Sequence, residues 1–428
     1  MIWIYRLCFP LILLATAPYY LWRMRRRGGY WHGFWHRFGL PPRLPERTPG
    51  RRRVWLQAVS VGEMLAVEPI VRGLVDDGVE VMLTTTTSTG YRVAAERHVP
   101  QVSAIAYFPV DWFPFSARAW ARISPDLAIV TEGERWPEHM HQARSRGVPV
   151  LCINARISDR SYRRLRRFPL AAALVMGPMT RLLASSAQDA RRFRDLGCPA
   201  ERVAVTGNIK LDVRIPLLDE ADRAKLRIEL GLPADRPVLL GASTWPGEEA
   251  ALVNALAAAR SSGVGCSLLV VPRHAERRAE VERLLKATGL KFHMRSHGAA
   301  AGTVDVAVAD TTGELRAMTQ LADLVFVGKS LAPHTEGQTP VEAAALGKPM
   351  LFGPGMGNFR SIARELLDRG AARCVVDAAD LCVQACALLR DPAQRGLISA
   401  AAAAWHSDNG GAVDRTLAAI REQLAGVA

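Results

Sequence analysis

Residues 54–63 read V-W-L-Q-A-V-S-V-G-E, and this stretch decides how we expect the chain to fold. The apolar run over 54–59 is typical of a strand that is covered on both faces of a parallel sheet. After it the apolar residues recur with helical spacing, which predicts a helix over 63–76. Glu63 should therefore lie in the first helical turn at the carboxyl-terminal edge of the sheet, where open α/β sheets bind their ligands.

Glu63 has two interpretations at this position. A carboxylate in the first turn of a helix is stabilised by the helix dipole, and in its ionised form it can act as a general base. Ser60 and Glu63 also have the spacing of a capping box, in which the serine is the N-cap and the glutamate reaches back to the serine amide. Taken alone, the stretch favours the capping role, because such boxes are common helix starts.

The composition is that of a folded protein of 428 residues, 49% of them apolar, which is enough for two or three domains. The net charge of +14 is concentrated near the N-terminus, since residues 23–53 contain ten Arg and one Glu. The seven cysteines form no C-x-x-C pair. We therefore predict a reducing compartment with neither a disulfide framework nor a zinc site.

The N-terminal segment predicts a membrane anchor over 1–27. Residues 2–22 are apolar apart from Arg6, and their number is close to the ~20 residues that a membrane helix needs. Four Arg follow at 23, 25, 26 and 27, so the positive-inside rule places the rest of the chain in the cytoplasm. A signal peptide is the competing interpretation, but its charges would precede the apolar core.

Residues 28–53 mix aromatic side chains with Arg, as in a segment that lies on anionic lipid headgroups. Charge alone would also permit binding to nucleic acid. The apolar anchor beside this segment makes a membrane surface the better partner, and we predict no nucleic-acid partner.

Short apolar strands alternate with helical segments in two long stretches, which predicts two doubly covered parallel sheets. We assign 54–212 to a first Rossmann-like domain, 213–236 to a linker with a short helix, and 237–428 to a second Rossmann-like domain. Two such domains facing a central cleft would suit a substrate with two parts. The expected strands are 54–59, 79–85, 104–107, 127–131, 149–153, 182–185 and 203–206 in the first domain, and 238–242, 267–271, 304–308, 324–327, 349–352 and 373–376 in the second.

Three polar motifs follow predicted strands of the first domain. E-G-E at 132–134 is either a solvated acidic turn or a pair of carboxylates that point the same way. N-A-R-I-S at 154–158 opens an Arg-rich stretch that is either a solvated basic face or a dock for a phosphate-bearing acceptor, contacted by Arg156 and Arg160. T-G-N-I-K at 206–210 places Lys210 after a glycine turn, where its ammonium group could meet a phosphate.

The second domain has four motifs of the same kind. G-A-S-T-W-P-G-E at 241–248 predicts a strand, a turn and a helix whose amides could receive phosphate oxygens, and P-R-H at 272–274 puts an Arg at the sheet edge. Residues 311–314 and 339–342 have the spacing of capping boxes, with Thr339 as the N-cap and Pro340 as the first helical residue of the second. Each box could be only a helix start.

The order of these motifs favours a sugar transferase, with an acidic helix start in one domain and cationic helix starts in the other. W-L-Q-A-V-S-V-G-E, E-G-E-R-W-P, N-A-R-I-S, T-G-N-I-K, V-P-R-H, T-G-E-L and P-V-E-A-A-A-L-G-K-P resemble the Kdo (3-deoxy-D-manno-octulosonic acid) transferases of lipopolysaccharide synthesis over nearly the whole chain. The resemblance implies a GT-B fold, an inverting mechanism without cofactor or obligatory metal, CMP-Kdo as donor and a lipid A precursor (lipid IVA) as acceptor. It also implies the cytoplasmic face of the inner membrane.

By motif match, the resemblance implies that Glu63 is the catalytic base and that Glu132 and Lys210 support the transition state. Ser60 and Gly62 join Arg156 and Arg160 as expected acceptor contacts. The expected contacts with the CMP-bearing donor are Ser243, Thr244, Pro272, Arg273, Gly313, Glu314, Leu315, Ser330, Thr339, Pro340, Val341 and Glu342.

The chain departs from the family pattern chiefly in the donor loop. Lys329 stands where the family usually has a second Gly, and Thr339 stands where it usually has Asn. Gln57, Gly133 and Glu138 replace the usual His, Thr and Asn. Two alternatives stay open on these grounds: a GT-B transferase that uses another nucleotide sugar, and a membrane-tethered nucleotide-sugar binding protein with weakened or no catalysis.

Overall fold

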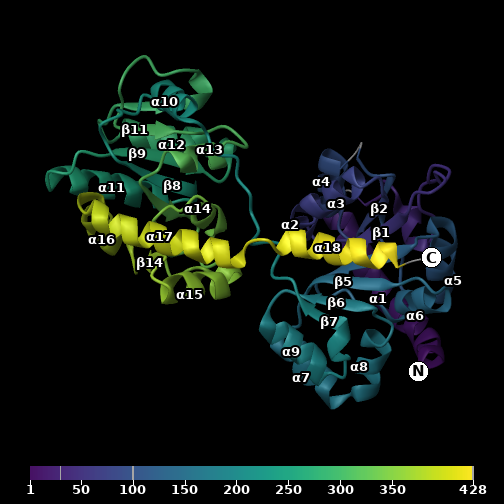
Figure 1. The fold of residues 1–428 in the computed structure, drawn as a ribbon. Helices are drawn as coiled ribbons and strands as arrows, with labels where there is room; N and C mark the ends of the chain where they lie inside the picture. The colour runs from purple at the N-terminus through teal and green to yellow at the C-terminus, as the bar shows by residue number, and fades with distance from the viewer. Residues whose placement is uncertain (29, 99–100, 427–428) are drawn as a thin grey trace. The chain divides into compact units, whose positions relative to one another are not determined.

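The computed structural model describes residues 1–28, 30–98 and 101–426. It divides the chain into two compact units: unit 1 comprises Met1–Asp212 and Gly410–Ala428, and unit 2 comprises Val213–Asn409. Each unit is built on its own seven-stranded parallel sheet (Figure 1). The predicted fold class of two Rossmann-like sheets is confirmed, whereas the predicted cleft between them stays a prediction.

The sheet of unit 1 has the strand order β3-β2-β1-β4-β5-β6-β7. The order reverses beside β1, so the topological switch point, where such sheets bind ligands, lies between β1 and β4. Every residue of β1, β4 and β5 is buried, as expected for strands covered on both faces. The strands are β1 Arg53–Gln57, β2 Glu80–Thr85, β3 Ala104–Tyr107, β4 Leu127–Thr131, β5 Val150–Ala155, β6 Arg181–Ala184 and β7 Val203–Val205.

The helix predicted over 63–76 is two helices, α2 (Val61–Ala66) and α3 (Glu68–Asp76). The break follows from Pro69, which has no amide proton to continue the hydrogen-bond ladder of α2. The other helices of unit 1 are α1 Ile2–Arg27, α4 Ser88–His98, α5 Phe113–Ile123, α6 Pro137–Ser145, α7 Asp159–Arg167, α8 Pro169–Met176, α9 Ala187–Asp195 and α18 Ala412–Ala425, with short 3-10 helices η1 Phe34–Phe38 and η2 Ala200–Arg202.

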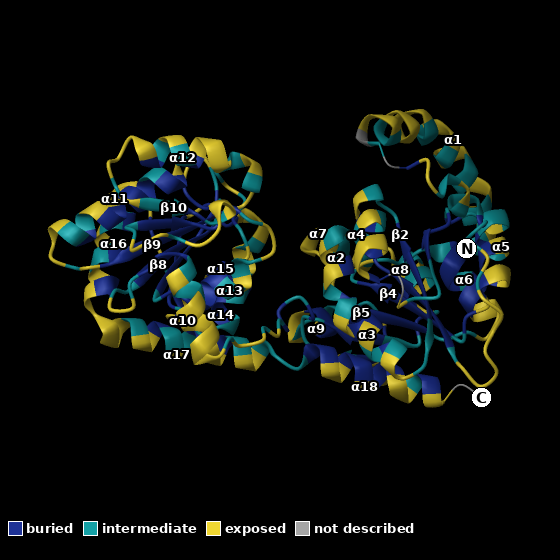
Figure 2. Ribbon diagram, turned by 90° about the horizontal axis from the view of Figure 1, so that it is seen from above, coloured by how far each residue is buried: buried dark blue, intermediate teal, exposed yellow. Residues whose placement is uncertain are grey.

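Unit 2 has the strand order β10-β11-β9-β8-β12-β13-β14, with its switch point between β8 and β12. Its strands are β8 Val238–Thr244, β9 Ser267–Pro272, β10 Phe292–Met294, β11 Val306–Val308, β12 Leu324–Val327, β13 Met350–Phe352 and β14 Ala372–Cys374. Its helices are α10 Glu220–Glu229, α11 Glu248–Ser261, α12 Arg278–Lys286, α13 Leu315–Gln320, α14 Val341–Ala345, α15 Arg360–Asp368, α16 Ala378–Arg390 and α17 Pro392–Asn409. In both units the dark strands lie inside and the exposed helix faces lie outside (Figure 2).

The C-terminal helix corrects the predicted boundary of the second domain, 237–428. Residues 410–428 belong to unit 1, where α18 packs against α3 and buries Leu417 and Ile420 in the core of that unit (Figure 1). Gly73 of α3 makes room for this contact, because a Cβ there would lie 2.7 Å from Leu417 Cδ1. The periodicity of residues 412–425 predicts an apolar face, but it does not reveal which sheet that face covers. The short helix expected in the linker is α10, and it belongs to unit 2.

Candidate active site

The carboxyl-terminal edge of unit 1 holds Glu63 in a fixed orientation. Its carboxylate accepts hydrogen bonds from the Val59 amide at 3.0 Å, the Ser60 hydroxyl at 2.9 Å and the Thr131 hydroxyl at 2.5 Å. Ser60 is the N-cap of α2 and accepts the Glu63 amide, so the predicted capping box is confirmed. One detail was wrong, because the glutamate reaches the amide of Val59 instead of that of Ser60.

Glu63 retains capacity for a substrate proton. A carboxylate has about four lone-pair sites, and three are occupied in this structure. The side chain is half-buried, while the neighbouring Gly62 is exposed and has no atom within 4 Å of the position a Cβ would take. Capping therefore leaves Glu63 able to accept a further proton donor, and the surface beside it at Gly62 is open.

A second polar group lies at the same edge, where β4, β5 and β7 end. Lys210 Nζ is 2.5 Å from Glu132 Oε1, and the Asn154 side-chain amide donates to the same oxygen at 3.3 Å. Asn154 Oδ1 also accepts the amide of Ile209 at 3.2 Å, which fixes the loop that carries Lys210. Asn154 is not among the predicted site residues, because the N-A-R-I-S motif predicts a role through its Arg charge and not through its amide.

Backbone strain marks this edge as well. Glu132 and Asn154 have φ angles of 50° and 49°, in the left-handed region that residues other than Gly rarely adopt. Such strain concentrates at functional sites, where the surrounding structure holds it in place. The exposed guanidinium groups of Arg156 and Arg160 are unpaired within the described residues, so both can reach an anionic acceptor.

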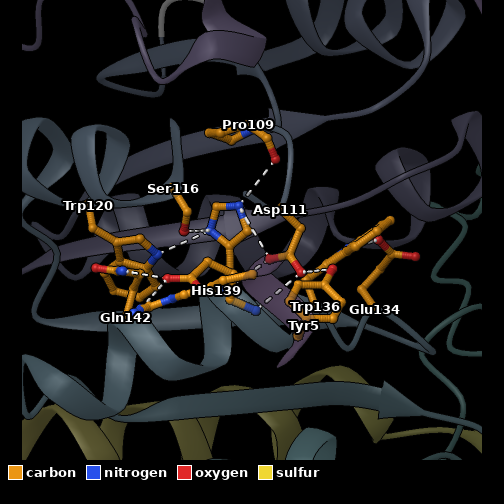
Figure 3. A network of polar contacts seen from close by, with 11 residues as sticks. Tyr5, Pro109, Asp111, Ser116, Trp120, Glu134, Trp136, His139 and Gln142 are labelled. Carbon is orange, nitrogen blue, oxygen red and sulfur yellow. Dashed lines mark hydrogen bonds and ion pairs between the residues drawn. The ribbon is translucent and has the colours of Figure 1, made fainter. Parts of the chain in front are cut away.

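Glu134 differs from the solvated acidic turn that was one of its two interpretations. It is partly buried and accepts a hydrogen bond from the Trp136 indole at 2.6 Å (Figure 3). Burial raises the pKa of Glu134 to about 6 against the effect of that hydrogen bond, and the charges of Glu63 and Glu132 raise it further. A carboxyl group that titrates near pH 6 therefore lies beside the candidate base.

The expected donor contacts of unit 2 lie at the carboxyl ends of neighbouring strands, while their role stays a prediction. Ser243 and Thr244 end β8, Pro272 ends β9 and Arg273 follows it. Residues 313–315 follow β11, Ser330 follows β12, and residues 339–342 form the start of α14 and the turn before it. The Arg273 side chain is exposed and unpaired among the residues that the structure describes. A phosphate could therefore approach it directly.

Two expected donor contacts have structural roles instead. The Ser330 hydroxyl is buried, donates to the Val327 carbonyl at 2.6 Å and accepts the Gly353 amide at 2.9 Å. The Thr244 hydroxyl is also buried and donates to Glu249 at 2.7 Å. Neither hydroxyl can reach a ligand, which corrects both predictions. A small hydroxyl residue at a sheet edge suits a ligand and a loop brace equally well, so the local pattern could not separate the two roles.

The helix start predicted at 311–314 is displaced. α13 begins at Leu315 with Glu314 as its N-cap, so Thr311 is not the cap. Glu314 instead forms an ion pair with Arg295 at 3.1 Å and accepts the Thr311 hydroxyl. Burial alone would raise the pKa of Glu314, but these hydrogen bonds outweigh burial and lower it.

The helix start predicted at 339–342 is displaced by one residue. α14 begins at Val341 with Pro340 as its N-cap, and the Thr339 hydroxyl accepts the Val341 amide at 3.3 Å. Glu342 pairs with Arg316 of α13 at 2.7 Å instead of reaching back to the amide of Thr339. An Arg from a neighbouring element therefore redirects the glutamate, and no local pattern contains that information.

Glu248, the first residue of α11, organises the donor edge, although we did not predict it as a site residue. Its side chain is buried, and its carboxylate accepts four backbone amides: Trp245 at 2.9 Å, Lys329 at 2.8 Å, Ser330 at 2.9 Å and Leu331 at 3.2 Å. These amides would otherwise suit a phosphate. The expectation that residues 241–248 offer their amides to the donor is thus corrected at Trp245, whose amide a protein carboxylate already occupies.

Lys329 adds a cation to this edge at a strained position. Its φ is 57°, which Gly would adopt without cost, and its Nζ lies 4.2 Å from the centre of the Trp245 ring and 3.4 Å from Glu336 Oε1. Gly328 must be Gly, because a Cβ there would lie 2.4 Å from the Ser243 carbonyl oxygen.

One cavity of unit 2 has no assigned role. This cavity of about 600 Å³ lies beside the loop after β12, lined in part by His334, Phe352 and Arg360, but no expected donor contact lines it. Over residues 1–28, 30–98 and 101–426, no group of three or more His, Cys, Asp or Glu side chains is arranged to hold a metal ion.

Replacing Glu134 by Gln is expected to stabilise unit 1 more at neutral pH than in acid. Its raised pKa means that the folded state binds the proton more tightly, so this carboxyl group favours folding below about pH 4.5 and loses that contribution as the pH rises through about 6. Gln stays neutral, so the gain over wild type should grow by up to about 2 kcal/mol across this range. Denaturant unfolding at an acidic and at a neutral pH measures the free energy of unfolding of both proteins. Glu96→Gln, at an exposed position of the same unit, is the control. A gain in stability that does not depend on pH would contradict the raised pKa of Glu134.

Replacing Glu248 by Gln is expected to destabilise unit 2 by roughly 2–4 kcal/mol. The Gln side chain is neutral, and its NH2 group would face backbone N–H groups that need an acceptor. Hydrogen exchange should quicken at the amides of residues 329–331. Glu276→Gln, at an exposed position of the same unit, is the matched control and should change stability by less than about 0.5 kcal/mol. Unchanged exchange at 329–331 would show that Glu248 does not hold the loop.

Comparison with known proteins identifies the family. A family model described as 3-deoxy-D-manno-octulosonic-acid transferase (kdotransferase) matches residues 32–213. The chain is 35% identical to a 3-deoxy-D-manno-octulosonic acid transferase of Bordetella pertussis, over 97% of this chain and 99% of that one, and 31% identical to its counterpart in Haemophilus influenzae, over 98% and 95%. UDP-GlcNAc 2-epimerase from Neisseria meningitidis, 14% identical, shares the fold over 87% of this chain and 99% of that one, with a TM-score of 0.56. The chain therefore belongs to the 3-deoxy-D-manno-octulosonic acid transferase family of glycosyltransferases.

Proposed function

We propose that this Kdo transferase moves Kdo from CMP-Kdo to a lipid A precursor, lipid IVA, and releases CMP. The position and hydrogen bonding of Glu63 are the observation that supports the proposal. Glu63 lies at the switch point of unit 1, held by three hydrogen bonds, half-buried and with room for one more proton donor. A positioned carboxylate of this kind is suited to take the proton of a sugar hydroxyl.

The reaction is a single displacement that inverts the anomeric carbon. Glu63 accepts the proton from the acceptor hydroxyl, and the hydroxyl oxygen forms a bond to the anomeric carbon of Kdo. The bond from that carbon to the phosphate oxygen breaks, and CMP leaves with the electron pair. Arg273 stabilises the charge on the departing phosphate, and Lys210, paired with Glu132, supports the transition state on unit 1.

The remaining exposed groups bind the two substrates. Arg156 and Arg160 contact the phosphates of the acceptor, because guanidinium groups bind phosphate in a bidentate manner. Ser60 and Gly62 line its path to the base. On unit 2 we assign donor contacts to Ser243, Pro272, Arg273, Gly313, Glu314, Leu315 and residues 339–342, and Lys329 contributes a cation that the usual Gly lacks.

The enzyme acts at the cytoplasmic face of the inner membrane in this proposal. One helix of the described chain, over residues 2–26, is long and apolar enough to enter a bilayer, and its apolar window is not buried in the protein. Arg23, Arg25 and Arg26 at its end suit the anionic lipids of that face.

Replacing Glu63 by Gln is expected to lower kcat for Kdo transfer by about 10²–10⁴-fold, since general-base catalysis contributes about that much. Product formation from CMP-Kdo and lipid IVA measures it. Glu96→Gln, exposed on α4 of the same unit, should keep full activity. A folded Glu63→Gln enzyme with near-normal turnover would remove Glu63 from the base role, and turnover of a UDP-sugar in place of CMP-Kdo would overturn the donor assignment.

A further inference from the structure

The N-terminal helix α1 is bonded to unit 1 at its start. The Tyr5 hydroxyl donates to Asp111 Oδ2 at 2.6 Å (Figure 3), and the Arg6 guanidinium donates twice to the Glu138 carboxylate, at 2.7 and 2.9 Å. Both carboxylates are fully buried. Asp111 also accepts the backbone amides of Glu138 and His139 at the start of α6, so the two attachment points are one connected structure.

Hydrogen bonds of His139 and Gln142 form a network next to these two carboxylates. His139 Nδ1 accepts a hydrogen bond from the Trp120 indole at 3.1 Å, so its Nε2 carries the proton and donates to the Pro109 carbonyl at 3.1 Å (Figure 3). Burial lowers the pKa of His139 to about 3, and the ring stays neutral. Gln142 donates to Glu138 at 2.6 Å. Without Arg6, Glu138 would be a buried carboxylate with no ion-pair partner in the described part of the chain, which is strongly unfavourable.

The chain returns to the same place directly after α1. The Tyr30 side chain is buried and stacks on Tyr107 with 6.0 Å between ring centres. Arg37 donates to the Thr86 carbonyl at 3.1 Å and lies 3.7 Å from the centre of the Tyr107 ring. Tyr30 and Arg37 of the segment predicted to lie on headgroups, 28–53, are therefore packed on the protein. Tyr107 and Asp111 are four positions apart, so the start of α1 and the segment that follows the helix are attached within one short stretch of unit 1.

This double attachment excludes a membrane-spanning arrangement of α1. Its 26 residues make a helix of about 39 Å. A spanning helix would place its two ends on opposite sides of a hydrocarbon core of about 30 Å. One surface of unit 1 cannot hold both ends while a bilayer separates them.

Much of α1 is exposed to solvent (Figure 2), and its exposed side chains are mostly apolar. These apolar side chains are Trp3, Ile4, Leu7, Leu11, Ile12, Leu14, Tyr19, Tyr20, Leu21 and Trp22, and Trp31 and Trp35 are exposed after the helix. Arg6, the one charge inside the apolar stretch, is neutralised by Glu138, as an ionisable group at membrane depth must be. Arg23, Arg25 and Arg26 then offer positive charge to anionic headgroups.

We propose that α1 is a monotopic anchor: it is embedded in one leaflet of an anionic bilayer, with both of its ends on the side that unit 1 occupies. The exposed apolar side chains enter the acyl region, and Trp31 and Trp35 sit at the headgroup level. Because the helix is braced on Asp111 and Glu138, it fixes how unit 1 faces the lipid. The inference rests on the membrane association proposed above, and it does not depend on which sugar is transferred.

Cysteine labelling tests the arrangement in the full-length enzyme in native membranes. Ile2→Cys and Arg51→Cys are each placed in a Cys8→Ser, Cys374→Ser background, which by itself measures the residual labelling of the half-buried Cys382 and Cys386. A membrane-impermeant maleimide should modify both cysteines in inverted vesicles and neither in intact spheroplasts. Modification of the two positions from opposite faces would overturn the proposal. Kdo transfer is measured on the same samples, so a failure of the proposed activity is distinguished from a failure of the topology.

A double-mutant cycle tests the brace itself. Arg6→Met should lower Tm by several degrees in lipid nanodiscs, and adding Glu138→Gln should restore part of the loss, because the buried charge disappears. Arg92→Met, exposed on α4 of the same unit, should leave Tm unchanged. Additive effects of the two substitutions would mean that Arg6 and Glu138 do not meet, and this would also contradict the proposal.

Discussion

The hydrogen bond from Thr131 to Glu63 joins the end of β4 to α2, the helix that follows β1, across the switch point of unit 1. It exists because β1 and β4 pair in parallel register, with Gln57 opposite Val130, which brings the end of β4 level with the turn after β1. A slip of one residue would turn Thr131 to the opposite face of the sheet. The orientation of the candidate base is therefore a direct consequence of strand register.

Unit 2 also has a carboxylate that links two segments at its switch point, but this carboxylate is fully occupied by the protein. Glu248 links the turn after β8 to the loop after β12, as Thr131 and Glu63 link β4 to α2. Glu248 is buried and accepts four amides, so it has no capacity left for a substrate and acts as a brace. Glu63 is half-buried and accepts three hydrogen bonds. Greater exposure and one unfilled lone pair distinguish Glu63, the proposed base, from Glu248, the structural carboxylate.

The sequence predicted what local periodicity determines. The two α/β halves and the serine cap at Ser60 follow from apolar spacing and turn residues, and the structure confirms them. The errors share one physical cause, which is contact between residues far apart in the chain. Ser330 is enclosed by β12 and the Gly353 turn, Glu342 is drawn away by Arg316, and α18 covers the sheet of the first half rather than the second. The pairing of Arg6 with Glu138 is of the same kind, since it spans 132 positions and leaves no local pattern.

The kcat of Kdo transfer by Thr131→Val, measured beside wild type, tests the central claim most directly. Valine keeps the shape of the side chain and removes the hydroxyl that donates to Glu63. We expect a lower kcat with little change in KM, because the base loses the hydrogen bond that fixes its orientation. A kcat equal to that of wild type would contradict the claim that Glu63, held across the switch point by Thr131, is the catalytic base.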